Sequence, residues 1–246
     1  MKKIGLSCLT IILVLLCACN VTNKITFLQS SVRLHLPGDD GEVSLDIPYY
    51  GETENVKLLS IKDYSSNVKV DPSYVIDYTY PMAYKDYQFL TTHIPMFEDM
   101  KVEFSTITYQ LDDKEKEADI GIYEIEKSGL NINETAINYS DVDVKNEFWI
   151  DIKTDGLGEL KEVKATNPDI QVETRIQKIV NKEMGTDTRV YVSYSKPEDY
   201  DLVITNFSYT FEHNGKDEVR YGKGVVLFPK DGIVEASGNF ESMTFG

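Results

Sequence analysis

The chain has 246 residues, with 41 Asp and Glu against 25 Lys and Arg, for a formal net charge of −16 at pH 7. Hydrophobic residues make up 41% and aromatic residues 11%, which is enough apolar material for a core, so wholesale disorder is excluded. The acidity argues against a nucleic-acid partner, because phosphates would be repelled, and three Cys with three His are too few for a zinc framework or a disulfide scaffold.

The first 18 residues have the pattern of a secretory signal peptide. Lys2 and Lys3 give a positive start, and residues 4–18 form an uncharged, mostly aliphatic run. This run is shorter than the ~20 apolar residues that a membrane-spanning helix needs. It fits the apolar region of a signal peptide, so we expect residues 1–18 to be removed from the mature protein.

The end of this segment, Leu16-Cys17-Ala18-Cys19, resembles the lipobox of bacterial lipoproteins. The resemblance implies that Cys19 receives a diacylglycerol and further acylation such as palmitate, and becomes the new N-terminus. Two acyl chains give firm anchoring, so the mature protein would be held at the extracytoplasmic face of a bacterial membrane. The alternative is an ordinary signal peptide cut after Ala18 or Asn20, without lipid.

Beyond a tether over residues 19–28, the body shows an internal match at an offset of 100 residues. Glu98-Asp99 corresponds to Glu198-Asp199, and apolar residues alternate after each pair, then change phase by one residue at the same place. One inserted residue flips the buried face, so we predict a β-bulge or a strand crossover at both places. The alternating positions are Met100, Val102, Phe104, Ile107, Tyr109 and Leu111 in the first copy, and Tyr200, Leu202, Ile204, Phe207, Tyr209 and Phe211 in the second.

A second block recurs at an offset near 105, where Asp46-Ile47 with Gly51 matches Asp151-Ile152 with Gly156. Apolar strand patterns precede both sites and follow them over residues 56–61 and 160–165. The change of offset indicates an ordinary difference in loop length. Hairpin turns are predicted at Asn214-Gly215, at Asp39-Asp40-Gly41 and across residues 184–186.

Short strands at ~8–12-residue spacing, without a convincing long helix, are typical of immunoglobulin-like sandwiches. We predict an all-β fold of two tandem immunoglobulin-like β-sandwich domains, over residues 29–127 and 145–246, joined by a linker over 128–144. The resemblance is one of architecture alone, because the Cys…Trp…Cys pattern of true immunoglobulin domains is absent and Trp149 is the single tryptophan.

Catalytic motifs are absent from the sequence: it has no GxSxG, and no mature cysteine besides Cys19. We therefore expect no catalytic residues, no enzyme activity and no cofactor other than the lipid. Calcium is the one metal worth weighing, with Asp141 and Asp143 as candidate ligands at the predicted domain junction. The alternative there is a polar linker with solvated charges.

Tyrosines crowd one segment of the first copy. Tyr78, Tyr80, Tyr84 and Tyr87 fall where the second copy has a different sequence. Tyrosine suits a rigid amphipathic contact surface, which predicts a binding site. The alternative is structural, because tyrosine is also common on half-buried strand faces.

These observations predict a non-enzymatic, lipid-anchored bacterial surface protein that binds or adheres to a protein or cell-envelope partner. One alternative is a structural spacer lipoprotein, which calcium would stiffen. A second is an envelope glycan hydrolase, which would need two carboxylates in a cleft.

Overall fold

A computed structural model describes residues 25–38, 41–51, 56–68, 78–84, 87–132, 134–139, 147–181, 185–195 and 199–227. Every regular element in these ranges is a β-strand, so the predicted all-β class is confirmed. The described part of the chain has no helix with the length and apolar character needed to cross a membrane.

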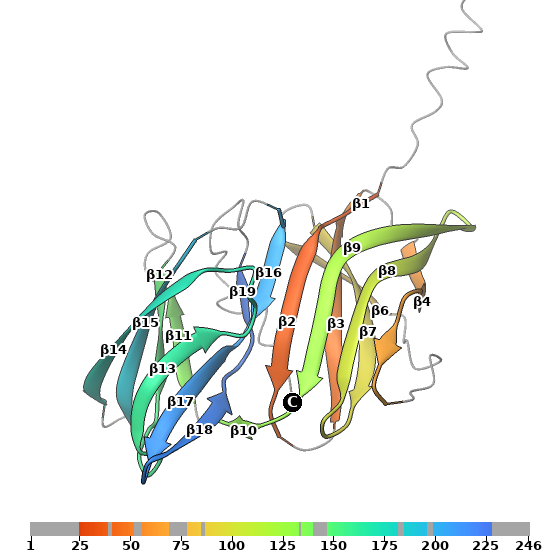
Figure 1. The fold of residues 1–246 in the computed structure, drawn as a ribbon. Helices are drawn as coiled ribbons and strands as arrows, with labels where there is room; N and C mark the ends of the chain where they lie inside the picture. Colours follow the sequence, from red (N-terminus) through yellow and green to blue (C-terminus); the bar gives the residue numbers. More distant parts are fainter. Residues whose placement is uncertain are drawn as a thin grey trace, which may run out of the picture.

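The strands fall into a first half, β1–β9, and a second half, β10–β19 (Figure 1). The first half consists of β1 (Thr26–Phe27), β2 (Ser30–Leu36), β3 (Gly41–Tyr50), β4 (Val56–Ile61), β5 (Ser65–Ser66), β6 (Tyr78–Tyr84), β7 (Tyr87–Met96), β8 (Lys101–Leu111) and β9 (Lys114–Lys127). The second half consists of β10 (Leu130–Asn131), β11 (Glu134–Tyr139), β12 (Glu147–Ile152), β13 (Glu159–Ala165), β14 (Val172–Asn181), β15 (Thr186–Tyr194), β16 (Leu202–Thr205), β17 (Phe207–His213), β18 (Lys216–Tyr221) and β19 (Val225–Leu227).

The strand pairing of the first half recurs in the second. The order β1-β3-β7-β6 has its counterpart in β11-β12-β15-β14, and the order β2-β9-β8-β4 in β10-β18-β17-β13. Each half has one parallel pair at the corresponding place, β2 with β9 and β10 with β18. The internal match seen in the sequence is therefore present as a shared pairing scheme.

The predicted change of phase takes a different form in each half. In β8 the pairing register with β9 shifts between Phe104 and Thr106, and both Phe104 and Ile107 are buried in the core. In the second half the chain passes at Asn206 from β16 to β17, which belong to different sheets. A bulge and a crossover thus occupy equivalent positions. The hairpin at Asn214-Gly215 is confirmed by the antiparallel pairing of β17 with β18.

One turn predicted from the sequence differs from the structure. The hairpin turn at Asp39-Asp40-Gly41 is wrong, because β2 pairs with β9 and β16 whereas β3 pairs with β1 and β7, so this connection joins two sheets. The predicted linker over residues 128–144 includes the strands β10 and β11. The boundaries of the two proposed domains stay predictions.

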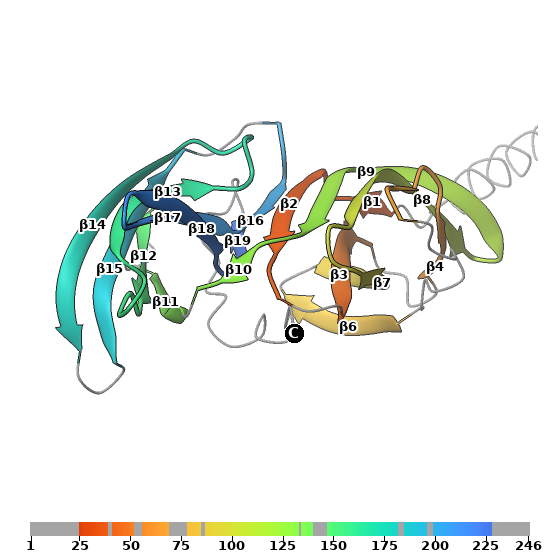
Figure 2. The same cartoon turned by 60° about the horizontal axis from the view of Figure 1, so that its bottom comes forward.

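Two strands of the second half, β16 and β19, belong to a sheet of the first. β16 pairs in parallel with β2, which extends the sheet to the order β19-β16-β2-β9-β8-β4, and Figures 1 and 2 show β16 beside β2 where the halves meet. All four residues of β16 are buried. Leu202 and Ile204 pack in the core of the first half, whereas Val203 packs in the core of the second.

We predict that Gly121→Ala destabilises the fold more than Gly215→Ala. Both glycines have positive φ, +89° and +73°, so alanine costs ~1–2 kcal/mol at either site. A Cβ at Gly121 would also lie 2.1 Å from the backbone oxygen of Ser30 in β2, whereas one at Gly215 meets nothing within 4 Å. Overpacking adds ~1–3 kcal/mol at Gly121 alone. Denaturant unfolding measures both free energies, and equal losses would contradict this assignment.

Candidate functional site

The predicted lipidation and calcium residues are outside the part of the chain that the structure describes. Cys19 precedes the first described residue, and Asp141 and Asp143 fall between β11 and β12. Lipidation and calcium binding therefore stay predictions. In the described ranges, His, Cys, Asp and Glu side chains form no group of three or more that could hold a metal ion.

The four tyrosines predicted to bind a partner lie on adjacent strands of one sheet. Their backbone is in β6 and at the start of β7, and their side chains lie outside the description. The backbone register pairs Tyr78 with Thr91, Tyr80 with Phe89 and Tyr84 with Tyr87. The structure thus brings the four positions together along one strand pair, and their role in binding stays a prediction.

Cross-strand polar pairs lie beside them on the face of β3 and β7 that points away from the core. Ser44 Oγ is 2.9 Å from His93 Nδ1, and Thr91 Oγ1 donates a hydrogen bond of 2.5 Å to Asp46. Burial raises the pKa of Asp46, although the Thr91 bond and His93 oppose the rise. In a Ser-His-Asp triad the carboxylate binds Nδ1 and serine faces Nε2. Serine faces Nδ1 here, so the arrangement gives no support for a nucleophilic serine.

The joint between the halves depends on the buried side chain of Asn206. Its amide nitrogen donates to the backbone oxygens of His35 and Gly222, the latter at 3.0 Å. Its amide oxygen accepts from the His35 backbone N–H at 3.1 Å and from Thr166 Oγ1 at 2.7 Å. Both amide hydrogens and the oxygen thus have partners, with His35 in the first half and with Thr166 and Gly222 in the second. Losing one buried partner costs ~1–3 kcal/mol.

A second asparagine, Asn167, has a similar role along the β2–β16 pair. Asn167 Nδ2 donates to the backbone oxygens of Ser31, at 3.1 Å, and Ile204, at 3.2 Å. Ser31 Oγ donates to Asp169 Oδ2 at 2.7 Å. The segment after β13 is therefore fixed to both β2 and β16.

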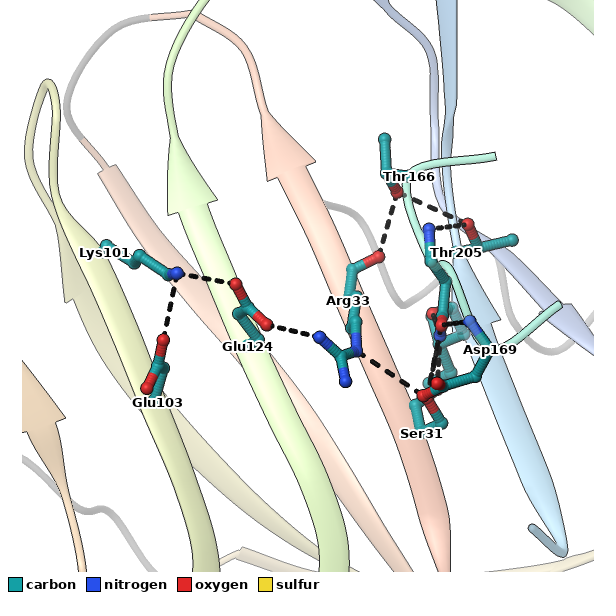
Figure 3. Close-up of polar contacts among 10 residues, drawn as sticks. Ser31, Arg33, Lys101, Glu103, Glu124, Thr166, Asp169 and Thr205 are labelled. Atoms are coloured by element: carbon teal, nitrogen blue, oxygen red, sulfur yellow. Dashed lines mark hydrogen bonds and ion pairs between the residues drawn. The ribbon is translucent and has the colours of Figure 1, made fainter. Parts of the chain in front are cut away.

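A row of alternating charges extends from this joint across β2, β9 and β8 (Figure 3). Its members, in spatial order, are Asp169, Arg33, Glu124, Lys101 and Glu103. Arg33 Nη1 and Lys101 Nζ each lie 2.7 Å from Glu124, Lys101 lies 2.9 Å from Glu103, and Arg33 Nε lies 3.5 Å from Asp169. The hydrogen bond from Lys101, with help from Arg33, lowers the pKa of Glu124.

A small open cavity of about 190 Å³ lies beside this row. Its lining consists of Arg33, Leu34, His35, Glu124, Glu126, Thr166 and Pro168. Ligand pockets usually measure ~300–1,000 Å³, so the cavity is below the size of most small-molecule sites. Carboxylates outnumber Arg33 on its walls, which disfavours an anionic ligand. We therefore interpret it as part of the joint.

Arginine and aromatic side chains share the face of β11-β12-β15-β14 that points away from the core. Residues of β15 alternate between buried and partly exposed, so Arg189 and Tyr191 face outward while Val190 faces the core. The register places Trp149 opposite Tyr191, and Tyr191 opposite Arg175. We call the four outward residues, Trp149, Arg175, Arg189 and Tyr191, the arginine–aromatic row.

An arginine lies over each ring of the arginine–aromatic row. The Arg175 guanidinium carbon is 4.1 Å from the centre of the Tyr191 ring, and that of Arg189 is 5.2 Å from the Trp149 ring. Arg189 also forms two hydrogen bonds to Asp151, at 2.7 and 2.8 Å. The row is therefore held in place before any partner binds. Trp, Tyr and Arg are the residue types that most often dominate interface energetics.

The sequence contained a signal for this row. Trp149 and Asp151 alternate with core residues on one strand, as Arg189 and Tyr191 do on another. Identifying the face required the register between β12 and β15, which lie far apart in sequence.

Comparison with known proteins adds no function. No family model and no curated protein match the chain. A solved structure of a marsupial T cell receptor is similar over 82% of this chain and 95% of that chain, with 8% sequence identity and a TM-score of 0.20. A similarity at this TM-score does not establish a shared fold.

We predict that Glu124→Gln lowers the free energy of unfolding at pH 7 by ~1 kcal/mol, a modest loss because the charged row is partly exposed. Since folding lowers the pKa of Glu124, its contribution is complete above the unfolded value of ~4.3 and disappears as pH falls through the folded value. Parent and variant should therefore converge in acid.

Urea unfolding at pH 7 and in steps below pH 4.3 measures this difference. Glu115→Gln is the matched control, because it removes one exposed carboxylate near the β8–β9 turn, away from the charged row. A Glu124→Gln loss that persists unchanged at the lowest pH would contradict the assignment.

Proposed function

We propose that the chain is a non-enzymatic, lipid-anchored bacterial surface protein whose two immunoglobulin-like modules bind a protein or envelope partner. The orders of the strands in the sheets support the assignment of two immunoglobulin-like modules. In immunoglobulin domains one sheet has the order A-B-E-D and the other contains C, F and G. Taking β3 as strand B, the orders β1-β3-β7-β6 and β9-β8-β4 follow this scheme, and the second half repeats it.

The arginine–aromatic row is the observation that carries the binding proposal. Its rings and guanidinium groups are fixed by cation–π contacts and by the Arg189–Asp151 pair. Fixed side chains lose less conformational entropy when a partner binds. Partly exposed Trp and Tyr rings offer apolar area to a protein surface.

Anchoring through Cys19 rests on the lipobox resemblance, which also supports a position at the extracytoplasmic face of a bacterial membrane. The strongly acidic body is repelled by anionic lipid headgroups. The lipid would therefore hold the chain while the body, with its outward faces, stands away from the membrane.

A rigid spacer is a second candidate function, favoured by the joint between the halves. The parallel pairing of β2 with β16 and the bonds of Asn206 and Asn167 fix one half on the other. A fixed joint sets a constant reach from the anchor to the far module. The two functions are compatible, since a rigid body also presents its binding face in a constant orientation.

We predict that Trp149→Ala and Tyr191→Ala each weaken partner binding at least tenfold, the loss expected at interface hot spots. The measurement is binding of the immobilised full chain to a solubilised envelope fraction of the bacterium that carries the gene. Leu59→Ala is the control, because Leu59 is 44% exposed on another sheet. Tyr80→Ala in the same assay tests the tyrosine segment. Retained binding with both variants of the row would contradict its role.

We predict that Cys19→Ala abolishes lipidation and releases the chain from the membrane fraction. Metabolic labelling with an alkyne fatty acid, followed by fractionation, measures both effects. Cys17→Ser is the matched control and should keep label and anchoring, since Cys17 occupies a lipobox position that tolerates small residues. Labelling of Cys19→Ala at the parent level would contradict the proposed anchor.

A further inference from the structure

Strand β14 lies at an open edge of the second half. Among the described residues its strand partner is β15 alone, and Figures 1 and 2 both place it at the rim of the molecule. An edge strand presents unpaired backbone N–H and C=O groups that can pair with another strand. β14 has 10 residues, which is long for a strand with one neighbour. Its free edge is therefore a potential contact surface.

Two opposite charges stand on this edge strand, two residues apart. Glu173 and Arg175 are both exposed. In the described ranges neither side chain forms an ion pair, and the contact of Arg175 is with the ring of Tyr191. Residues two apart on a strand share a face, so the free edge carries one acid and one base side by side. Such a pair is complementary in charge to the same pair on a second strand that runs in the opposite direction.

Antiparallel pairing of two copies of β14 produces this arrangement of opposite charges. About a two-fold axis, residues equally distant from the axis face each other. With Thr174 on the axis, Glu173 of each copy faces Arg175 of the other. On the opposite side of the strand, Val172 then faces Ile176, whose side chain is 36% exposed in one copy. An axis at Glu173 or at Arg175 would instead place like charges together.

We propose that β14 is a self-association edge, through which two copies of this chain pair antiparallel about Thr174. The sheet β11-β12-β15-β14 continues across the axis into the same sheet of the second copy. Two Glu173–Arg175 pairs and two Val172–Ile176 contacts favour this register. The net charge of −16 on each chain opposes close approach at low ionic strength, and the paired area is small, so the dimer is weak and concentration-dependent. Neither the pairing nor its test depends on lipidation.

Charge reversal tests the register in solution. Sedimentation of the purified full chain in mild detergent, at ~0.15 M salt and up to about 200 μM chain, should show a reversible dimer. Arg175→Glu should weaken the dimer at least tenfold, because two pairs of like charges then face each other. The double variant Glu173→Arg/Arg175→Glu should restore it. This variant also lacks the Arg175–Tyr191 contact, so its recovery isolates the pairing between copies. A parent chain that stays monomeric, or a dimer indifferent to Arg175→Glu, would overturn the proposal.

Oxidative cross-linking tests the position of the axis. Thr174→Cys places a thiol next to its symmetry mate, within the spacing that directly opposite strand residues share. Copper-catalysed oxidation should therefore yield a disulfide-linked dimer above the level given by the native cysteines of the parent chain. Gln177→Cys is the control, because it lies three residues from the axis and faces Gln171 of the other copy. Equal cross-linking of both variants would overturn the register, while selective cross-linking at Thr174 supports it. Denaturation midpoints close to that of the parent confirm that each variant is folded.

Discussion

The pairing of β16 with β2 is the constraint on which the rest of the structure depends. This four-residue strand closes the edge of the first sheet and supplies Leu202 and Ile204 to one core and Val203 to the other. Burying each of these side chains contributes ~1.5–3 kcal/mol. Because neighbouring residues of one strand stabilise different cores, the halves are coupled through packing as well as through hydrogen bonds. The asparagines at the joint then satisfy backbone groups that the crossover at Asn206 would otherwise leave without partners.

The sequence alone predicted those structural features that depend on residues close to one another along the chain. Alternation in β8 revealed its buried face and the bulge after Phe104, and Asn214-Gly215 specified a hairpin because both residues accept positive φ. The turn at Asp39-Asp40-Gly41 failed because the same residues suit a connection between sheets. Parallel pairing of β2 with β16 joins segments about 170 residues apart and leaves no local pattern. In retrospect, the unbroken apolar run Leu202–Ile204 indicated a strand buried on both faces.

The candidate site was harder to predict for the same reason. The sequence predicts a binding site at β6 because several tyrosines lie within one short segment of the chain. The arginine–aromatic row is assembled from three strands, one residue or two from each, and none of these segments has an unusual composition. In both halves the sheet concerned occupies the same place in the pairing scheme. Equivalent strands of the two halves therefore differ in sequence, with tyrosines on β6 and the start of β7 and with arginines and aromatics on β12, β14 and β15.

The shared strand also has a consequence for the order in which the molecule is made. Synthesis runs from the N-terminus, so β2 emerges long before β16 exists. Until then the first half has an open sheet edge and lacks Leu202 and Ile204 in its core. An exposed edge and an incomplete core are the features that promote mispairing between nascent chains. The first half therefore stays incomplete until the second half has been synthesised. The time for which its sheet edge is exposed to mispairing depends on how long the intervening chain takes to be made.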